Sequence, residues 1–165
     1  MEGTTLNIIC TYRNLPLSPG HKACVASMWC GKIYIDHWAM EGLSSAGNIQ
    51  GVLADALVSI LNHHGVDKVL KWADDFCLFH IPTPHALADK GILSHHYSID
   101  ITSVFLITDP LGLPWHPVDV KGQDFASMVS YMGFLWDLQS QSMLLLTKKC
   151  LKYLVKIRSF QSAVK

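Results

Sequence analysis

The sequence feature that most constrains the fold is a pair of adjacent aspartates set between two apolar runs near the middle of the chain. Residues 69–72 read Val-Leu-Lys-Trp and residues 76–79 read Phe-Cys-Leu-Phe, with Asp74 and Asp75 between them. β-Branched and aromatic residues on both sides of a short polar segment predict a buried β-hairpin with the acids at its tip. Two neighbouring carboxylates are typical of a simple turn, because Asp tolerates turn geometry, or of a site for a hard divalent cation. The residues of this stretch alone favour the turn.

The charges are divided unevenly along the chain. Of its 165 residues, 50% are hydrophobic and 16% are charged, which suits one domain with a core or a piece of a larger one. Residues 148–165 hold six of the 13 Lys and Arg and no acid, so this tail carries +6 and the preceding 147 residues carry −6. Such an asymmetry indicates a basic element suited to nucleic acid, joined to an acidic body, and a solvated amphipathic helix is the alternative with the same sequence pattern.

Cysteine and histidine usage argues against a disulfide framework and against a zinc site. The five cysteines are an odd number, lie far apart and form no Cys-x-x-Cys pair. The pairs His63-His64 and His95-His96 lack a second pair at zinc spacing, so we expect them on the solvated surface. The start of the chain shows no signal-peptide pattern, and no apolar run reaches the ~18 residues of a membrane helix. We therefore expect an intracellular protein, cytoplasmic or nuclear, that is neither secreted nor bound to a membrane.

Hydrophobic periodicity predicts short strands and hairpins separated by helices. Apolar residues recur at i, i+3, i+4 and i+7 between positions 49 and 61, which predicts an amphipathic helix over residues 45–64. A second helix is expected over residues 100–108. It should end there, because the proline at position 110 disfavours helix in the residue before it. The other expected elements are a strand over 6–10, a hairpin of 23–29 and 32–38, an irregular segment over 85–97, a strand over 127–138 with a partner at 143–146, and a basic helix from 147 to 165.

Five short blocks of sequence occur in order along the chain: LNIICTYR at 6–13, EGLSSA at 41–46, Trp72-Ala73-Asp74-Asp75, LGLPWH at 111–116 with Lys121 shortly after, and YMGFLWDL at 131–138. In these blocks and in the order of its elements, the chain resembles the palm and early thumb of a reverse transcriptase from a retrotransposon. Trp72-Ala73-Asp74-Asp75 resembles the family's aromatic-x-Asp-Asp motif, residues 6–13 resemble the strand of its first palm motif, and the other three blocks follow the family's order. Together the five blocks are spread over nearly the whole chain.

The resemblance implies a nucleotidyl-transfer site. It implies that Asp74 and Asp75 bind catalytic Mg²⁺, in a two-metal mechanism if the chain is active, with the residue at position 7 as a further ligand. Tyr12 falls at the position that blocks the ribose 2′-hydroxyl of an incoming ribonucleotide. Lys121 matches a lysine that protonates the leaving pyrophosphate, although a solvated loop charge is the alternative.

The resemblance also implies contacts with nucleic acid. Met132, Gly133 and Phe134 fall in the hairpin that grips the primer end. The implied partners are an RNA or DNA template-primer and deoxynucleoside triphosphates. The basic residues expected to contact nucleic acid are Lys148, Lys149, Lys152 and Lys156.

The chain departs from the family at the position that matters most for chemistry. Asn7 stands where the first motif carries its catalytic aspartate. Asparagine is neutral and has one acceptor oxygen where aspartate has two. Asp75 is not expected to compensate, because neighbouring side chains on an extended strand point to opposite faces. Met40-Glu41 replace a proline and an aromatic residue, and we expect the fingers to be missing. Polymerase activity is therefore expected to be lost.

The fold expected is α+β, with a polymerase-type palm in which two helices pack on an antiparallel sheet. Residues 1–122 are expected to form a partial palm, 123–146 a primer-grip-like hairpin and 147–165 the first helix of the thumb. Three functions stay open at this point. The chain is a degenerate reverse transcriptase fragment, a non-catalytic nucleic-acid-binding remnant, or a retroelement relic without a function.

Overall fold

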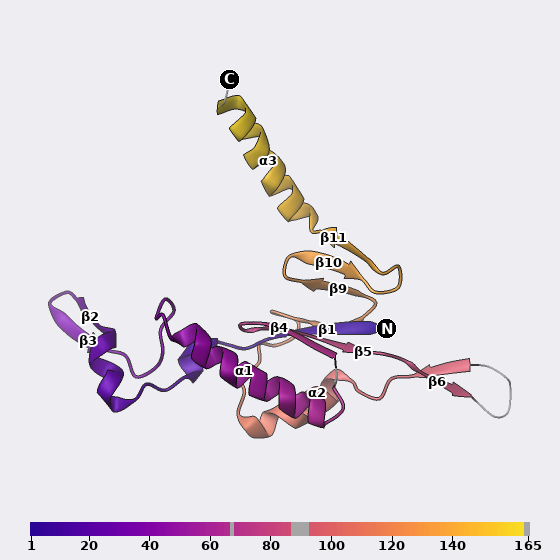
Figure 1. Ribbon diagram of the computed structural model, residues 1–165, viewed down its shortest axis with the longest axis horizontal. Helices are drawn as coiled ribbons and strands as arrows, with labels where there is room; N and C mark the ends of the chain where they lie inside the picture. The colour runs from indigo at the N-terminus through magenta and orange to yellow at the C-terminus, as the bar shows by residue number, and fades with distance from the viewer. Residues whose placement is uncertain (67, 87–92, 164–165) are drawn as a thin grey trace.

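The computed structural model describes residues 1–66, 68–86 and 93–163, and an antiparallel sheet that carries the Asp74-Asp75 hairpin lies at its centre (Figure 1). Neighbouring strands of this sheet are all antiparallel. The strand order is β4 (Lys68–Trp72), β5 (Asp75–His80), β1 (Glu2–Asn7) and β8 (Gln123–Ala126). The predicted sheet is therefore present, and β8 adds a strand that the sequence pattern did not indicate.

Two helices cover one face of the sheet. Helices α1 (Ala46–His63) and α2 (Ile101–Thr108) both lie below the sheet in Figure 1. Asp100 caps α2, because its carboxylate accepts a hydrogen bond of 2.7 Å from the Ser103 N–H. Every second residue of β1 and β5 points towards the helices, as strand geometry requires. The buried core formed in this way consists of Leu6, Ile8, Ala54, Leu57, Leu61, Val66, Phe76, Leu78 and Val104.

A second antiparallel sheet covers the other face of the first. Its strands run in the order β11 (Ser142–Leu145), β10 (Phe134–Asp137) and β9 (Met128–Tyr131). Cys77 of β5 packs here against Val129 and Tyr131, and all three side chains are buried. Gly3 of β1 allows the close approach, because a Cβ at this position would lie 2.8 Å from the Cγ2 of Val129. The central sheet is thus covered on both faces.

The segment over 127–138 is a hairpin and not the single strand expected from its composition. β9 ends at Tyr131 and β10 begins at Phe134, and these two residues face each other across the turn. Met132 and Gly133 have φ values of 52° and 81°. Positive φ at both central positions is the geometry of a type I′ turn, which matches the twist of the flanking strands. The Met-Gly pair is therefore the turn signal that the strand-like composition concealed.

The first expected strand and hairpin are also displaced. The strand expected over 6–10 runs from Glu2 to Asn7, because Cys10 has a φ of 47° and the 3-10 helix η1 (Thr11–Asn14) follows. The hairpin of β2 (Ala26–Trp29) and β3 (Lys32–Ile35) is shorter than expected at both ends. The 3-10 helix η2 (Pro19–Val25) occupies the residues before it.

Two further segments complete the description. A hairpin of β6 (Thr83–Ala86) and β7 (Leu93–His96) takes the place of irregular structure at residues 85–86 and 93–96 of the segment expected over 85–97, of which residues 87–92 lie outside the described residues. A 3-10 helix, η3 (Asp109–Leu111), ends α2 where the proline predicted an end. Within the described parts of the chain, no helix combines the length and the apolar content that a membrane span requires.

Helix α1 matches the predicted range, but its buried face is rotated from the predicted stripe. Ile49, Val52 and Leu53 were expected to be buried and are 48%, 68% and 54% exposed. The residues that α1 buries are Ala46, Gln50, Ala54, Leu57 and Leu61. A glutamine therefore lies on the face that points towards the acidic hairpin, whereas apolar side chains point to solvent.

The last helix, α3 (Thr147–Ala163), projects away from the two sheets (Figure 1). Its side chains are exposed from Thr147 to Ser162. Residues 164–165 of the expected basic helix lie outside the described residues. The helix predicted from the basic tail is therefore present, and both its basic and its apolar side chains face solvent.

Candidate active site

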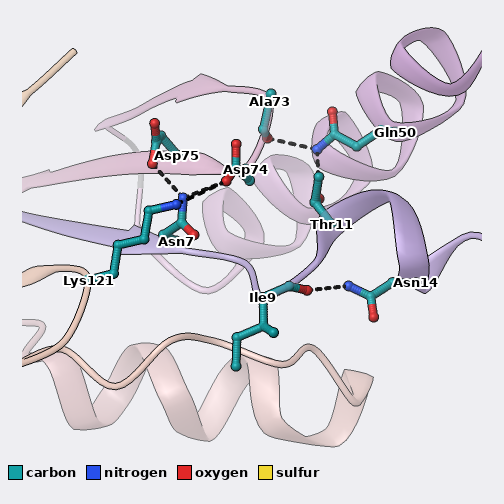
Figure 2. A network of polar contacts seen from close by, with 9 residues as sticks. All are labelled: Asn7, Ile9, Thr11, Asn14, Gln50, Ala73, Asp74, Asp75 and Lys121. Atoms are coloured by element: carbon teal, nitrogen blue, oxygen red, sulfur yellow. Dashed lines mark hydrogen bonds and ion pairs between the residues drawn. The ribbon is translucent and has the colours of Figure 1, made fainter. Parts of the chain in front are cut away.

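Asn7, Asp74 and Asp75 converge at one end of the central sheet (Figure 2). Asn7 is the last residue of β1 and lies directly opposite Asp75, the first residue of β5. Asp74 belongs to the turn between β4 and β5 and lies beside them. The amide nitrogen Nδ2 of Asn7 donates a hydrogen bond of 2.8 Å to Asp74 Oδ2 and one of 2.5 Å to Asp75 Oδ1. The structure thus brings together the three positions that the resemblance singled out.

The two aspartates point to the same place, contrary to the alternation expected of an extended strand. Asp75 begins β5, but Asp74 lies in the turn, where the alternation of strand side chains does not apply. The turn itself is attached to β1, because the Ile8 N–H donates to the Asp74 carbonyl at 3.0 Å. Both carboxylates therefore reach the single amide of Asn7.

Helix α1 supports this turn through Gln50, a residue that the sequence analysis missed. The Gln50 side chain is 5% exposed, and its amide nitrogen donates to the Ala73 carbonyl at 2.7 Å and to Thr11 Oγ1 at 3.5 Å (Figure 2). Ala73 has a φ of 51°, a left-handed conformation that few non-glycine residues adopt. The sequence signal for a buried polar role was the position of Gln50, which falls at helical spacing among apolar residues that α1 buries.

The charge at the site is balanced in part by Lys121. Its ammonium Nζ lies 3.4 Å from Asp74 Oδ2, and the Lys121 side chain is half exposed. Partial burial of Asp74 opposes its ionisation. The hydrogen bond from Asn7, the backbone and the charge of Lys121 outweigh this effect and hold the pKa of Asp74 below its ordinary value. Asp74 is therefore an anion at neutral pH, and Lys121 is the nearby cation.

A polar cavity of about 270 Å³ opens beside these residues. The hydroxyl of Tyr131 lies at its wall and donates to the Asp75 carbonyl at 3.4 Å. Burial, with the nearby Cys77 and Asp75, raises the pKa of Tyr131 to about 12, so its hydroxyl stays protonated. A larger cavity of about 580 Å³, between β4 and the second sheet, is mostly apolar, and neither Asp74 nor Asp75 lines it. The polar cavity is therefore the one adjoining the candidate site.

The other predicted site residues lie on three different elements. Tyr12 is in η1 and packs against a small buried cluster of Leu15, Ala39 and Ala46. Met132 and Gly133 form the turn between β9 and β10, and Met132 lines the polar cavity. Lys149 of α3 reaches back to this turn, where its Nζ donates to the Met132 carbonyl at 3.4 Å. A Cβ at position 133 would overlap the Lys149 side chain, so glycine permits this contact.

The residues present do not fit a pair of divalent cations. Mg²⁺ is bound by carboxylate, carbonyl and water oxygens. Across the described residues, no group of three or more His, Cys, Asp and Glu side chains gathers in one place. The third side chain of the site presents a nitrogen to both carboxylates, and its own oxygen Oδ1 is buried without a partner. This donor set differs from the oxygen cluster that the resemblance implied.

The left-handed turn residue leads to a stability prediction. Ala73→Gly is expected to stabilise the chain by about 0.5–1 kcal/mol, because glycine adopts a positive φ without the Cβ penalty and this outweighs its extra backbone entropy. The matched control is Ala54→Gly in the buried face of α1, where the same change should cost about 1 kcal/mol or more. Urea unfolding of both variants measures the two signs. Destabilisation by Ala73→Gly would contradict the strain inferred at this turn.

Comparisons with known proteins identify the fold. No protein-family model matches the chain, and no curated protein sequence matches it. The chain is similar to the foamy viral protease-reverse transcriptase solved in complex with dsDNA, at 15% identity and a TM-score of 0.67, over 89% of this chain and 27% of that one. It is also similar to that protein in complex with an RNA/DNA hybrid, at 12% identity and a TM-score of 0.61, over 89% of this chain and 17% of that one. The native prototype foamy virus protease-reverse transcriptase matches at 19% identity and a TM-score of 0.59, over 88% of this chain and 16% of that one.

At these identities the likeness concerns the fold. The chain has a reverse-transcriptase-like fold, and it spans between 16% and 27% of the length of these three structures.

Proposed function

We propose that this chain is part of the palm of a retrotransposon reverse transcriptase, with the start of the thumb, and that it has lost nucleotide addition in its present form. Residues 1–122 form the partial palm, 123–146 the primer-grip-like hairpin and 147–165 the start of the thumb. The reverse-transcriptase-like fold supports this proposal, and so does the order of the five sequence blocks. An intracellular location, where an RNA or DNA template-primer is available, is part of the proposal.

The single observation that carries the loss of activity is the Asn7 amide between the two aspartates. In-line phosphoryl transfer by two metal ions needs carboxylates that bridge both ions and compensate their charge. Asp74 and Asp75 supply two carboxylates, but Asn7 contributes no charge and turns its nitrogen towards them. Mg²⁺ and a deoxynucleoside triphosphate are therefore ligands of the ancestral site in this proposal, and not of the present one.

Nucleic-acid binding is the second candidate function, and the surface of α3 favours it. Lys148, Lys152 and Lys156 follow one another at intervals of four residues, so their side chains form a stripe along one side of the helix. All three are exposed, and within α3 there is no acidic residue to pair with them. A line of ammonium groups on a projecting helix is suited to a phosphate backbone. We propose that this stripe, with the neighbouring Lys149, binds the template-primer.

Two measurements test the two parts of the proposal. Fluorescence anisotropy should show that the chain binds a labelled RNA/DNA hybrid. The logarithm of the binding affinity should fall linearly with the logarithm of the salt concentration between about 50 and 200 mM. Primer extension on a homopolymeric template with Mg²⁺ should yield no product. Measurable extension would contradict the loss of activity. Absence of binding would favour a relic without a function.

A further inference from the structure

The carboxylates of Asp74 and Asp75 are already bound by hydrogen-bond donors of the chain itself. The Asn7 amide has two hydrogens, and each is directed to a different aspartate, at N···O distances of 2.8 and 2.5 Å. Asn7 is 2% exposed, so water contributes little to this arrangement. The Lys121 ammonium lies 3.4 Å from the same oxygen of Asp74 that accepts from Asn7. Donors thus approach the pair from two elements, β1 and the loop before β8.

The position of the Asn7 nitrogen is also the position that a shared cation would need. An ion bound to both carboxylates lies between their oxygens, with Mg²⁺ at about 2.0–2.1 Å from each ligand atom. The nitrogen of Asn7 occupies this gap, in contact with Asp74 Oδ2 and Asp75 Oδ1. Cation and amide therefore exclude each other unless Asn7 moves.

The orientation of the Asn7 amide follows from the two carboxylates that it faces. Turning the amide over would direct Oδ1 at two carboxylate oxygens, which is repulsive without a cation. In the observed orientation Oδ1 is buried and has no partner. An unpaired buried acceptor is destabilising, so the two hydrogen bonds to the aspartates must outweigh this cost. The carboxylates, and not the surroundings of Oδ1, set the orientation.

We propose that the Asn7 amide and the Lys121 ammonium take the place of divalent cations, so that these two residues join β1 and the loop before β8 to the Asp74-Asp75 turn without a metal. This inference deepens the proposed function, because it concerns the same site and explains how a former metal site stays folded. Asn7 acts as a positioning residue for the two aspartates. The chemistry of the site is then that of a structural junction that Mg²⁺ and Mn²⁺ neither enter nor stabilise.

The test compares the full chain with Asn7→Asp in thermal unfolding, with EDTA and with increasing MgCl₂ or MnCl₂. The natural chain should show the same Tm throughout. Asn7→Asp places three carboxylates together, so its Tm in EDTA should be lower and should rise with either cation, by roughly 5–10 °C at 100-fold excess over Kd. Equal cation-induced shifts in the two chains would overturn the inference. Equal stability of the two chains in EDTA would overturn it as well.

A second measurement uses only the natural chain and decides the matter if Asn7→Asp does not fold. The side-chain NH₂ protons of Asn7 should give resolved NMR signals that exchange slowly with water, because both are hydrogen-bonded and buried. Added Mn²⁺ should leave these signals unbroadened. Selective broadening would place the ion at the site and overturn the inference. Loss of RNA/DNA hybrid binding, measured without metal, would count against the proposed function alone.

Discussion

Phe76→Ala is expected to destabilise the chain by about 3–5 kcal/mol, a large part of the roughly 5–15 kcal/mol by which a domain is ordinarily stable. Phe76 is fully buried, and its ring packs edge-on against Trp115 with the ring centres 5.5 Å apart. It follows Asp75 on β5 and points to the opposite face of the sheet, into the core between the sheet and the helices. The substitution therefore removes apolar contacts and leaves a cavity directly under the candidate site.

The matched control for this prediction is Phe160→Ala in α3, where the ring is 71% exposed. The same chemical change should alter the free energy of unfolding there by no more than about 0.5 kcal/mol. Urea unfolding followed by circular dichroism gives both values. A cost below about 1.5 kcal/mol at Phe76 would mean that β5 is not the centre of the core.

Replacing Lys148, Lys152 and Lys156 together by alanine is expected to abolish most of the binding to an RNA/DNA hybrid. If each lysine contacts one phosphate, the slope of log affinity against log salt concentration should become less steep by roughly 2–3. The affinity near 100 mM salt should fall at least about tenfold. The lysines of α3 are exposed, so their removal should leave the free energy of unfolding almost unchanged. The measurement is fluorescence anisotropy at several salt concentrations.

The control for net charge is the triple variant Lys22→Ala, Lys32→Ala and Lys68→Ala, which removes the same charge from η2, β3 and β4. Its salt slope should stay close to that of the natural chain. If both triple variants lose the same affinity, the interaction follows total charge, and the stripe on α3 is not a binding surface.

Local signals predicted the elements that carry the site, and tertiary contacts decided how those elements meet. Periodicity located α1 to within one residue, the proline at position 110 marked the end of α2, and the two aspartates marked the hairpin. The apolar period failed in the first half of α1, because Gln50 is buried where it supports the Ala73 carbonyl. No local pattern reports that a helix side chain serves a turn that follows it in the sequence.

The arrangement of the two aspartates shows a different limit of sequence reasoning. Alternation along a strand predicted opposite directions for them, but Trp72 pairs with Asp75, so Asp74 lies in the turn and not in the strand. The strand β8 was missed because its short pairing with β1 contains an irregularity between Gly3 and Thr5. In both places the hydrogen-bond partner lies far away in the sequence, and the residues of the segment alone carry no sign of it.

The role of position 7 is tested most directly in a chimaera with a longer reverse transcriptase. This chain replaces the matching segment of the foamy viral protease-reverse transcriptase, once with Asn7 and once with Asn7→Asp. Because Asp at position 7 restores a third carboxylate beside Asp74 and Asp75, primer extension with Mg²⁺ should appear only in the Asn7→Asp chimaera. Equal extension by the two chimaeras would contradict the account, since position 7 would then not be the residue that decides activity.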